Sequence, residues 1–423
     1  MITAEEYKLR RERLFEKMEN ESMAILFSGV GKVASADENY PFEVNRNFYY
    51  LTGIDQEDSA LILLKGSGEH KAYLFVSPFD PVKEKWYGKR LTEAEAASIS
   101  GVHNVLFSTA LASRVEHLLS SGIGDLEPIR KVYLDLDREI KIADDTFTTD
   151  YKEQLKKLSK DIVISDIKQM ILDLRYVKSE AEIEEYRLAV KITAQGIRSV
   201  MAATKNGVHE YELANLFLKT VNDASGYQGL AFPTIMASAG HSTILHYPTP
   251  LDTLHQGDVL LMDLGARNQY YCADVSRTVP IGGKFSELQK KIYTIVLNCN
   301  KAVAKFACPG KTIKDLQAFT IEYLSSECVN AGLLETKEDI TKVYFHGVSH
   351  HIGLDTHDPH SKDKPLEPGC IISDEPGLYF ADLGIGVRIE DDLLITENGA
   401  EVLTQEIIKE VEDIEAFYAH VRR

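Results

Sequence analysis

The fold is indicated first by an apolar segment that carries two aspartates, VLLMDLGARNQYYCADV at residues 259–275. Apolar runs on either side of a short polar stretch predict the two strands of a β-hairpin. A turn at Asn268–Gln269 would place Asp263 directly opposite Asp274. Their Cβ atoms would then lie roughly 4.5–5.5 Å apart. We therefore expect the two carboxylates to be cross-strand neighbours.

A second segment, DEPGLYFADLGIGVRIEDD at residues 374–392, repeats this arrangement. A turn at Asp382–Leu383 would place Glu375 opposite Glu390, unless a β-bulge shifts the register. Like charges at this spacing repel by about 3 kcal/mol per pair at an effective dielectric constant near 20. A single pair of this kind would be interpreted as two solvated acids. Two pairs, both bordered by apolar strand residues, favour a compensating cation.

Histidines supply the nitrogen ligands that a cation site of this kind would need. Five of the thirteen histidines lie between residues 346 and 360, and His246 lies further upstream. A lone histidine is usually a hydrogen-bonded structural residue, whereas oxygen-rich sites with one or two imidazoles suit Mn, Co or Fe and tolerate Zn. Four carboxylates and a histidine could hold two divalent ions. Because Gly347 follows His346, the H-E-x-x-H zinc-protease motif is absent.

The order of these motifs resembles that of the pita-bread metallopeptidases, a group that includes aminopeptidase P, prolidase and methionine aminopeptidase. The similarity extends over roughly residues 178–405. One departure is Leu264, where alanine is common in the family, and it removes no ligand. The motifs that carry the resemblance are Met262–Gly265, Ala273–Thr278, Gly347–His350, Glu375–Tyr379 and Arg388–Asp392.

The resemblance implies a centre of two divalent metal ions. Asp263 would hold one ion, Asp274 and Glu390 would bridge both, and His350 and Glu375 would complete the second. Mn²⁺ is the first expectation for the metal, and Co²⁺, Zn²⁺ and Fe²⁺ are the alternatives.

The resemblance also implies the catalytic and substrate-binding residues. Glu375 would handle the proton of an activated water, and His246 and His357 would contact the substrate and stabilise the tetrahedral intermediate. Substrate would also lie against His350. Arg388 is either a charge partner of the carboxylates or a further substrate contact.

The amino-terminal half distinguishes among these relatives. Residues 35–53 and 86–90 resemble parts of the amino-terminal domain of aminopeptidase P, and Ser349 fits that enzyme better than prolidase. The implied reaction is release of the amino-terminal residue from peptides with proline in the second position. The near alternative is a prolidase, which is restricted to Xaa-Pro dipeptides.

The only tryptophan, Trp86, lies in the second of these segments. One interpretation is core or interface packing. The resemblance offers a sharper one, in which Trp86 covers the proline side of a neighbouring subunit's pocket. That role implies a homodimer or homotetramer.

Functions of a different class remain open. Some relatives with this fold bind other proteins without a metal, and creatinase-like relatives hydrolyse a small molecule without the metal pair. Both would be expected to carry substitutions among the five ligand positions. None is substituted here.

Length and charge limit the remaining choices. With 423 residues, the chain predicts two domains, an α/β amino-terminal domain at residues 1–174 and an α+β pita-bread catalytic domain at residues 175–423. A formal net charge of −18 argues against a nucleic-acid partner. Five widely spaced cysteines, no secretory signal and no long apolar run predict a cytoplasmic protein with no membrane segment.

Helical periodicity and capping signals predict the main helices. Thr3 and Glu6, and again Ser179 and Glu182, have the spacing of a capping box. The expected helices cover about 4–19, 149–159, 180–203, 208–223, 285–307 and 312–331, and the expected amino-terminal strands include 23–27, 60–64 and 131–136. Each half of the carboxyl-terminal domain therefore has helices followed by an acid-bearing hairpin.

Overall fold

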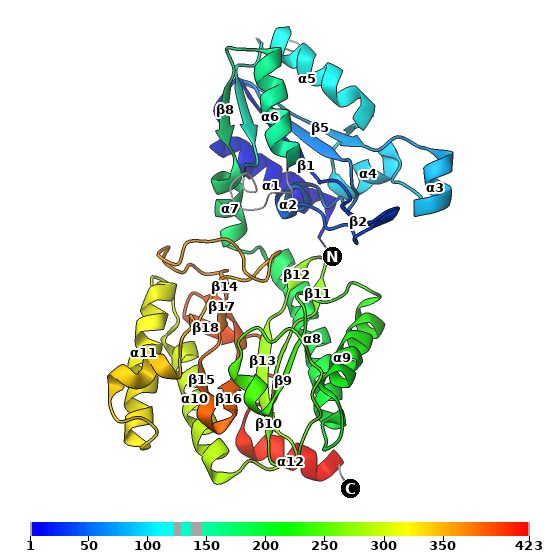
Figure 1. Cartoon of the computed structure of the whole chain (residues 1–423). Helices are drawn as coiled ribbons and strands as arrows, with labels where there is room; N and C mark the ends of the chain where they lie inside the picture. Colours follow the sequence, from blue (N-terminus) through cyan, green and yellow to red (C-terminus); the bar gives the residue numbers. More distant parts are fainter. Residues whose placement is uncertain (1, 122–127, 137–145, 422–423) are drawn as a thin grey trace. The chain divides into compact units, whose positions relative to one another are not determined.

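The computed structural model describes residues 2–121, 128–136 and 146–421. The chain divides into two compact units, Ile2–Arg175 and Tyr176–Arg423 (Figure 1). This division lies one residue beyond the expected boundary. The expected fold classes are confirmed, because the first unit is built on one mixed sheet with helices and the second combines helices with broken antiparallel hairpins.

The amino-terminal unit contains a six-stranded sheet in the order β6-β5-β4-β1-β7-β8. Only β4 is antiparallel to its neighbours, so the other five strands end at the same edge of the sheet. The near-continuous apolar run of β1 is buried, as expected for a central strand. The strands are β1 (Ser22–Phe27), β4 (Ala60–Lys65), β5 (His70–Val76), β6 (Asn104–Phe107), β7 (Lys131–Leu134) and β8 (Val163–Asp166).

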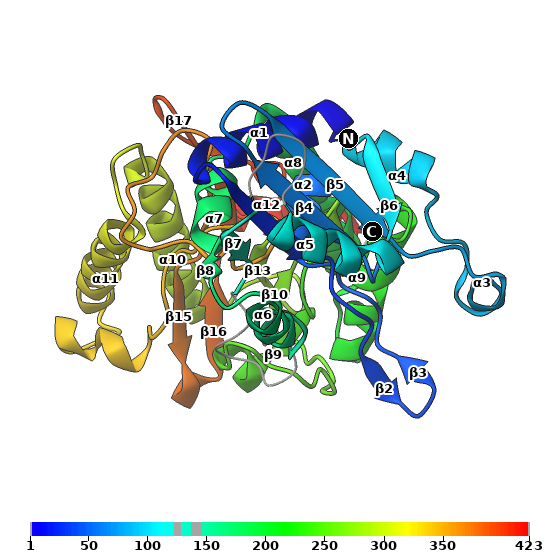
Figure 2. The same ribbon diagram turned by 90° about the horizontal axis from the view of Figure 1, so that it is seen from above.

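Helices and a small hairpin complete this unit. Thr3 caps α1 as expected, but Glu6 pairs with Arg10 at 3.4 Å instead of completing a capping box. Both α3 and the β2–β3 hairpin project from the body of the unit (Figure 2). The elements are α1 (Ala4–Lys17), β2 (Val33–Ser35), β3 (Glu38–Asn39), α2 (Arg46–Thr52), α3 (Pro81–Tyr87), α4 (Glu93–Ser100), α5 (Leu111–Ser120), α6 (Thr146–Leu158) and α7 (Lys168–Tyr176).

The carboxyl-terminal unit repeats one order of elements, as the sequence predicts. In the first half, the helices α8 (Glu180–Ala203) and α9 (Glu210–Ser225) precede the strands β9 (Ile235–Ser238), β10 (Val259–Leu264), β11 (Arg267–Asn268), β12 (Tyr271–Cys272) and β13 (Val275–Pro280). In the second half, α10 (Glu287–Phe306) and α11 (Ile313–Asn330) precede β14 (Ile371–Asp374), β15 (Gly377–Phe380), β16 (Ile385–Arg388), β17 (Asp391–Thr396) and β18 (Gly399–Val402). The last helix is α12 (Val411–Val421). The capping box at the start of α8 is confirmed.

The register predicted for the first hairpin is wrong by two residues. β10 and β13 pair Asp263 with Ser276, not with Asp274. The turn is formed by Gln269–Tyr270, where both φ angles are positive, 50° and 66°. Because the shift is even, both aspartates still lie on the same face of the hairpin.

The turn moves because Asn268 is held elsewhere. Its side-chain amide donates to the buried carboxylate of Glu185 on α8 at 2.5 Å. The backbone of Asn268 then pairs with Tyr271 as the last rung before the turn. A contact with a distant helix thus decides the turn position.

The register predicted for the second hairpin is confirmed. Gly377 pairs with Arg388 in β15–β16, and Asp374 pairs with Asp391 in β14–β17, so one register runs through both ladders. Glu375 and Glu390 lie opposite each other in the gap between the two ladders.

Both hairpins are interrupted where the acids lie. The amide of Glu375 donates to Val348 O at 2.8 Å, and that of Glu390 donates to Ser276 O at 3.0 Å. In the first hairpin the gap lies at Gly265, where an added Cβ would come within 2.0 Å of a carbonyl oxygen. The breaks in the ladders therefore bring the strands of the two hairpins together around the acids.

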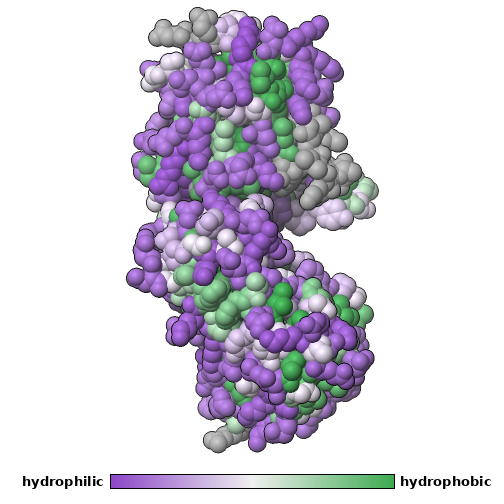
Figure 3. Space-filling view, turned by 90° about the vertical axis from the view of Figure 1, so that its left-hand side faces the viewer, coloured by the Kyte–Doolittle hydropathy of each residue, from purple (hydrophilic) through white to green (hydrophobic). Residues whose placement is uncertain are grey.

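Hydrophilic residues predominate on the face of the molecule that Figure 3 shows. Apolar residues form smaller patches on the same face. Among the described residues, no helix combines the length and the apolar composition that crossing a bilayer requires.

Candidate metal centre

The structure brings the five predicted ligands together. Their donor atoms fall into overlapping groups in which all atoms lie within 4.8 Å of one another. One group contains three acids from both hairpins, and another joins His350 to two glutamates. Nε2 of His350 lies 3.4 Å from Asp274 and 3.6 Å from Glu375. The full set is Asp263, Asp274, His350, Glu375 and Glu390.

The ring of His350 is oriented for ligation through Nε2. Its Nδ1 lies 3.1 Å from the carbonyl oxygen of His351, so Nδ1 is the protonated nitrogen that donates this bond. The backbone amide of His350 donates to Ser373 Oγ at 2.9 Å. Metal-ligating histidines usually donate their other ring N–H to a carbonyl or carboxylate in this way. Nε2 therefore faces the acids.

Two carboxylate oxygens test whether a cation fits this site. One oxygen of Asp263 and one of Glu390 are buried and have no hydrogen-bond partner among the described residues. Their second oxygens accept bonds from Arg388 at 2.7 Å and from Ser276 at 2.7 Å, respectively. A buried anion without a partner is costly. These two oxygens fit a cation that lies between the hairpins.

The pKa shifts of the acids also indicate a cation at this site. Burial, and then repulsion from neighbouring acids, raises the pKa of Asp274 and of Glu390 well above their ordinary values. Burial also raises the pKa of Glu375, against the opposing effect of His350 and Arg388. Without a cation, protons would partly occupy this site. A divalent ion would hold the same acids in the ionised state.

Arg388 lines the cavity of the site and makes three hydrogen bonds to the protein. Its Nη2 donates to Asp263, its Nε donates to Ser276 Oγ at 2.8 Å, and its Nη1 donates to Tyr379 OH at 3.2 Å. The side chain is buried. This geometry favours the charge-partner interpretation of Arg388 over direct contact with substrate.

Arg277 fixes the backbone that carries Glu390. Its guanidinium is inaccessible to solvent and donates to the carbonyl oxygen of Glu390 at 2.6 Å and to Asp391 Oδ1 at 2.7 Å. Lys409 forms a second ion pair with the same aspartate. Burial alone would raise the pKa of Asp391, but the two cations outweigh it and lower this pKa. The network holds one of the broken strands in place.

Sequence reasoning did not single out two polar residues that support the side chains of the site, Tyr379 and Ser276. Tyr379 OH lies 2.9 Å from Nε2 of His346, and Ser276 connects Arg388 to Glu390. Burial lowers the pKa of His346 to about 4. Each missed residue lies an even number of positions after an acid on its strand, so period-two alternation was a usable signal.

His246 and His357 lie at the mouth of the site. Both line a cavity of about 410 Å³ that also contains the five acid and histidine ligands. The ring centroid of His357 is 4.2 Å from that of His350. Partial burial and the neighbouring His350 lower the pKa of His357 to about 4, so the ring is neutral at pH 7. Neutral imidazole N–H groups can donate to a substrate oxygen.

A second cavity adjoins the first. It has a volume of about 640 Å³ and shares Asp263, Asp274, His246 and His357 with the first cavity. Its remaining wall is mainly apolar and aromatic, with Phe232, Pro233, Tyr247 and Pro248. A ligand could therefore extend to both sides of the aspartates.

The loop that carries His357 is anchored by a buried ion pair. Nζ of Lys178 lies 3.3 Å from Asp358, and both side chains are almost inaccessible to solvent. His360 also contacts this carboxylate at 3.0 Å. The anchor restrains the residue next to His357.

Trp86 does not belong to either cavity. It lies on α3 of the amino-terminal unit, and 79% of its surface is exposed. Core packing is therefore wrong for this residue, and packing at an interface remains a prediction.

Acids and a histidine that converge on broken hairpins are a donor set suited to a metal-dependent hydrolase. The model of metallopeptidase family M24 matches residues 184–397, and that of the aminopeptidase P amino-terminal domain matches residues 7–123. The chain belongs to metallopeptidase family M24. It is therefore a metallopeptidase that depends on divalent metal ions.

Similar proteins cover the whole chain. The Xaa-Pro aminopeptidase of Haemophilus influenzae is 33% identical over 433 residues, which span 98% of this chain and 97% of the relative. A solved structure from Bacillus anthracis, attributed to aminopeptidase P, is 38% identical, covers 99% of both chains and has a TM-score of 0.95. The structure of Escherichia coli aminopeptidase P with the inhibitor Pro-Leu is 30% identical in sequence and has a TM-score of 0.91. The match covers 100% of this chain and 99% of the Escherichia coli chain. These similarities confirm the resemblance to aminopeptidase P.

Proposed function

We propose that this protein is a dinuclear Xaa-Pro aminopeptidase, which releases the amino-terminal residue from peptides with proline in the second position. The observation that carries the proposal is the convergence of four acids and one histidine where two hairpins are broken. Relatives described as Xaa-Pro aminopeptidases match both units of the chain. That full-length match supports this activity over that of relatives with the catalytic unit alone.

Each of the five ligands has a proposed place. Asp263 would hold one ion, Asp274 and Glu390 would hold both, and His350 and Glu375 would complete the second. When bound, the ions would supply an activated water at neutral pH and neutralise negative charge on the substrate. The oxygen-rich donor set favours Mn²⁺, and Co²⁺, Zn²⁺ and Fe²⁺ are the alternatives.

Glu375 is the proposed proton carrier. One of its oxygens lies 3.4 Å from Ser373 Oγ and 3.6 Å from Nε2 of His350, so the carboxylate faces the site. Burial raises its pKa, which brings the group closer to the operating pH of a general acid and base. Glu375 would take a proton from the attacking water and pass it to the leaving proline nitrogen.

The two outer histidines would stabilise charge on the substrate. His246 and His357 line the cavity from its mouth, and His357 is neutral at pH 7. Their N–H groups can donate to the oxygen of the scissile carbonyl as it becomes negative. Arg388 would hold the carboxylate of Asp263 in position through its hydrogen bond.

Proline specificity has a structural requirement. The nitrogen of an Xaa-Pro bond carries no hydrogen, and the proline ring fixes its own φ, so ordinary strand-like recognition fails. The adjoining cavity with Phe232, Tyr247 and Pro248 offers an apolar wall beside the aspartates. That wall supports recognition of the proline ring or of an apolar first residue.

Metal replacement combined with a peptide series tests the proposal. Protein depleted of metal would be restored with Mn²⁺, Co²⁺, Zn²⁺ or Fe²⁺ and assayed with Ala-Pro-Ala, Ala-Pro and Ala-Ala-Ala. We expect cleavage of Ala-Pro-Ala after the first residue and little cleavage of Ala-Ala-Ala. Cleavage of Ala-Pro alone would favour the prolidase alternative. Equal rates for Ala-Pro-Ala and Ala-Ala-Ala would contradict proline recognition.

A further prediction concerns Trp86. Its exposed position on the projecting helix α3 suits contact with a second copy of the chain, where it would cover the proline side of the partner's pocket. Replacement of Trp86 by alanine should reduce the turnover of Ala-Pro-Ala and leave the metal content unchanged. Light scattering of the wild-type protein should show an oligomer.

The matched control is Tyr227→Ala, which removes another aromatic side chain with 84% of its surface exposed. This control should retain normal turnover. A wild-type protein that is monomeric and fully active would rule out the role proposed for Trp86.

A further inference from the structure

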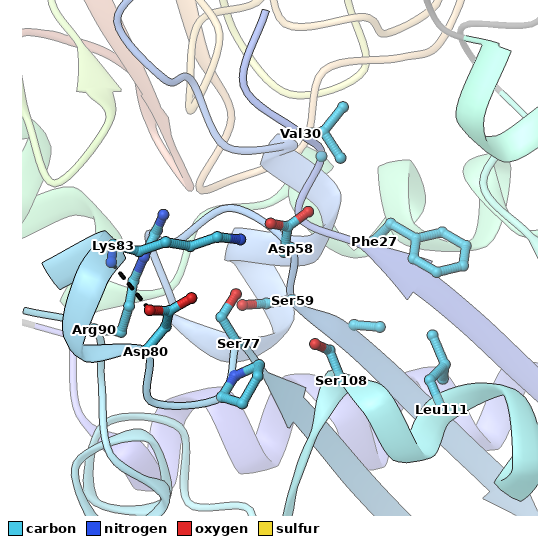
Figure 4. Close-up of a pocket in the computed structure, with 13 residues that line it drawn as sticks. Phe27, Val30, Asp58, Ser59, Ser77, Asp80, Lys83, Arg90, Ser108 and Leu111 are labelled. Atoms are coloured by element: carbon cyan, nitrogen blue, oxygen red, sulfur yellow. Dashed lines mark hydrogen bonds between the residues drawn. The ribbon is translucent and has the colours of Figure 1, made fainter. Parts of the chain in front are cut away.

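The amino-terminal unit contains a cavity of its own, with a volume of about 310 Å³ (Figure 4). It lies at the edge of the sheet where the parallel strands end. Phe27 ends β1, Ser77 follows β5, and Ser108 follows β6. In open α/β sheets, ligands bind outside the carboxyl ends of the strands. The volume is at the lower end of the range for small-molecule sites.

One end of the cavity carries opposite charges that do not pair. Among the residues that the structure describes, neither Lys83 nor Asp58 makes a side-chain ion pair or hydrogen bond. Figure 4 shows the lysine side chain extending toward the aspartate. The other charged groups are already engaged, because Arg90 pairs with Glu57 and Asp80 caps α3. One cation and one anion are therefore left facing the cavity.

The backbone of Asp58 is held in an unusual conformation. Its φ of +55° lies in the left-handed region, which is uncommon for residues other than glycine. Its amide donates to Gly29 O at 3.0 Å, which fixes this position. Partial burial, and then the neighbouring Glu57, raises the pKa of Asp58 against the weaker attraction of Arg90 and Lys83. Strained backbone of this kind is concentrated at ligand-binding and catalytic sites.

The opposite end of the cavity is apolar. Figure 4 shows Phe27 and Leu111 on the side away from Lys83, with the hydroxyls of Ser77 and Ser108 between the two ends. Val30 adds a further apolar wall. A matching ligand has adjacent positive and negative groups at one end and an apolar body at the other.

We propose that this cavity binds a free α-amino acid with an apolar side chain, such as leucine. Its ammonium group would contact Asp58, its carboxylate would contact Lys83, and its side chain would lie against Phe27 and Leu111. Serine hydroxyls could add hydrogen bonds to the charged groups. Hydrogen bonds to charged groups are among the stronger polar contacts.

The site gives the amino-terminal unit a ligand of its own. An amino acid is also the class of product that the proposed peptidase reaction releases, and this link rests on the proposed function. Binding itself does not depend on the reaction. The experiment therefore measures binding and not turnover.

Titration calorimetry of the full-length, metal-loaded protein with three ligands tests the charge requirement. Leucine should bind. N-acetyl-leucine lacks the ammonium charge and leucinamide lacks the carboxylate, so each should bind at least about tenfold more weakly. Equal affinity for all three compounds, or no binding of leucine, would overturn the proposal.

Variants locate the binding site. Asp58→Asn and Lys83→Gln should each weaken leucine binding about tenfold or more, since each removes one charge-assisted contact. Asparagine tolerates the left-handed conformation, so the first variant preserves the backbone. Lys85 lies on the same helix but does not line the cavity, so the Lys85→Gln variant should bind leucine normally.

A variant of the metal centre separates the two possible locations of bound leucine. His357→Ala should leave leucine affinity unchanged if the amino-terminal cavity is the site. If His357→Ala loses binding while Lys83→Gln retains it, leucine occupies the catalytic cavity and the proposal is wrong. Normal peptide turnover in Asp58→Asn and Lys83→Gln, measured without added leucine, would show that both variants fold.

Discussion

Replacement of Glu390 by alanine is expected to abolish peptide hydrolysis while the fold is retained. Glu390 lies where the second hairpin is broken, and one of its buried oxygens has no partner among the described residues. The variant would remove a ligand proposed to serve both ions. Metal ions supply several kcal/mol of transition-state stabilisation, which corresponds to a loss of about 10³-fold or more in kcat. Asp274→Ala should behave in the same way.

The matched control for this prediction is Asp382→Ala. Asp382 is an exposed acid at the tip of the same hairpin, so its loss should leave turnover and metal content unchanged. Circular dichroism would check that all three variants remain folded. Near-normal turnover of Glu390→Ala or Asp274→Ala at saturating metal would show that the bridging role is wrong.

Replacement of His357 or His246 by alanine is expected to slow turnover about 10²–10³-fold, the usual cost of losing one oxyanion donor. Both rings line the mouth of the cavity, and His357 lies beside His350. The metal content should be unchanged, because neither side chain is proposed as a ligand. Steady-state kinetics and elemental analysis on the same samples would measure both quantities.

The geometry gives this prediction a clear alternative outcome. The donor atoms of Asp274, His350 and His357 also lie within 4.8 Å of one another. If His357→Ala loses metal together with activity, His357 is a ligand and not an oxyanion donor. His209→Ala provides a control, because His209 is the N-cap residue before α9 (Glu210–Ser225) and does not line either cavity.

Local patterning predicted the second hairpin better than the first. The turn near Asp382–Leu383 depends on short-range geometry, with Gly384 in the left-handed conformation, and its register is confirmed. The first turn is shifted because Asn268 bonds to Glu185, which is 83 residues away in the sequence. Contacts of that range cannot be read from local alternation.

The faces of the acids were predictable even where the register was not. Asp263 and Asp274 stay on one side of their hairpin because any even shift preserves the face. By contrast, the breaks in both ladders were not predicted. In the second hairpin the break lies where backbone amides bond outside their own ladder, as Glu390 does to Ser276 and Glu375 does to Val348.

Supporting residues were the hardest to predict. Arg277 lies in ordinary strand sequence, and its importance becomes visible only when it meets Glu390 and Asp391 in three dimensions. The cavity in the amino-terminal unit is a similar case, because it joins residues from four separate strand ends. Long-range assembly of this kind leaves no periodic signal in one sequence.

Counting and locating the bound metal ions tests the central claim most directly. Elemental analysis of the purified protein, combined with anomalous diffraction from its crystals, should find two divalent ions per chain. They should lie within about 4 Å of one another, as in other paired-metal hydrolases, among Asp263, Asp274, His350, Glu375 and Glu390. A single ion held by His346 and His350 would contradict the account.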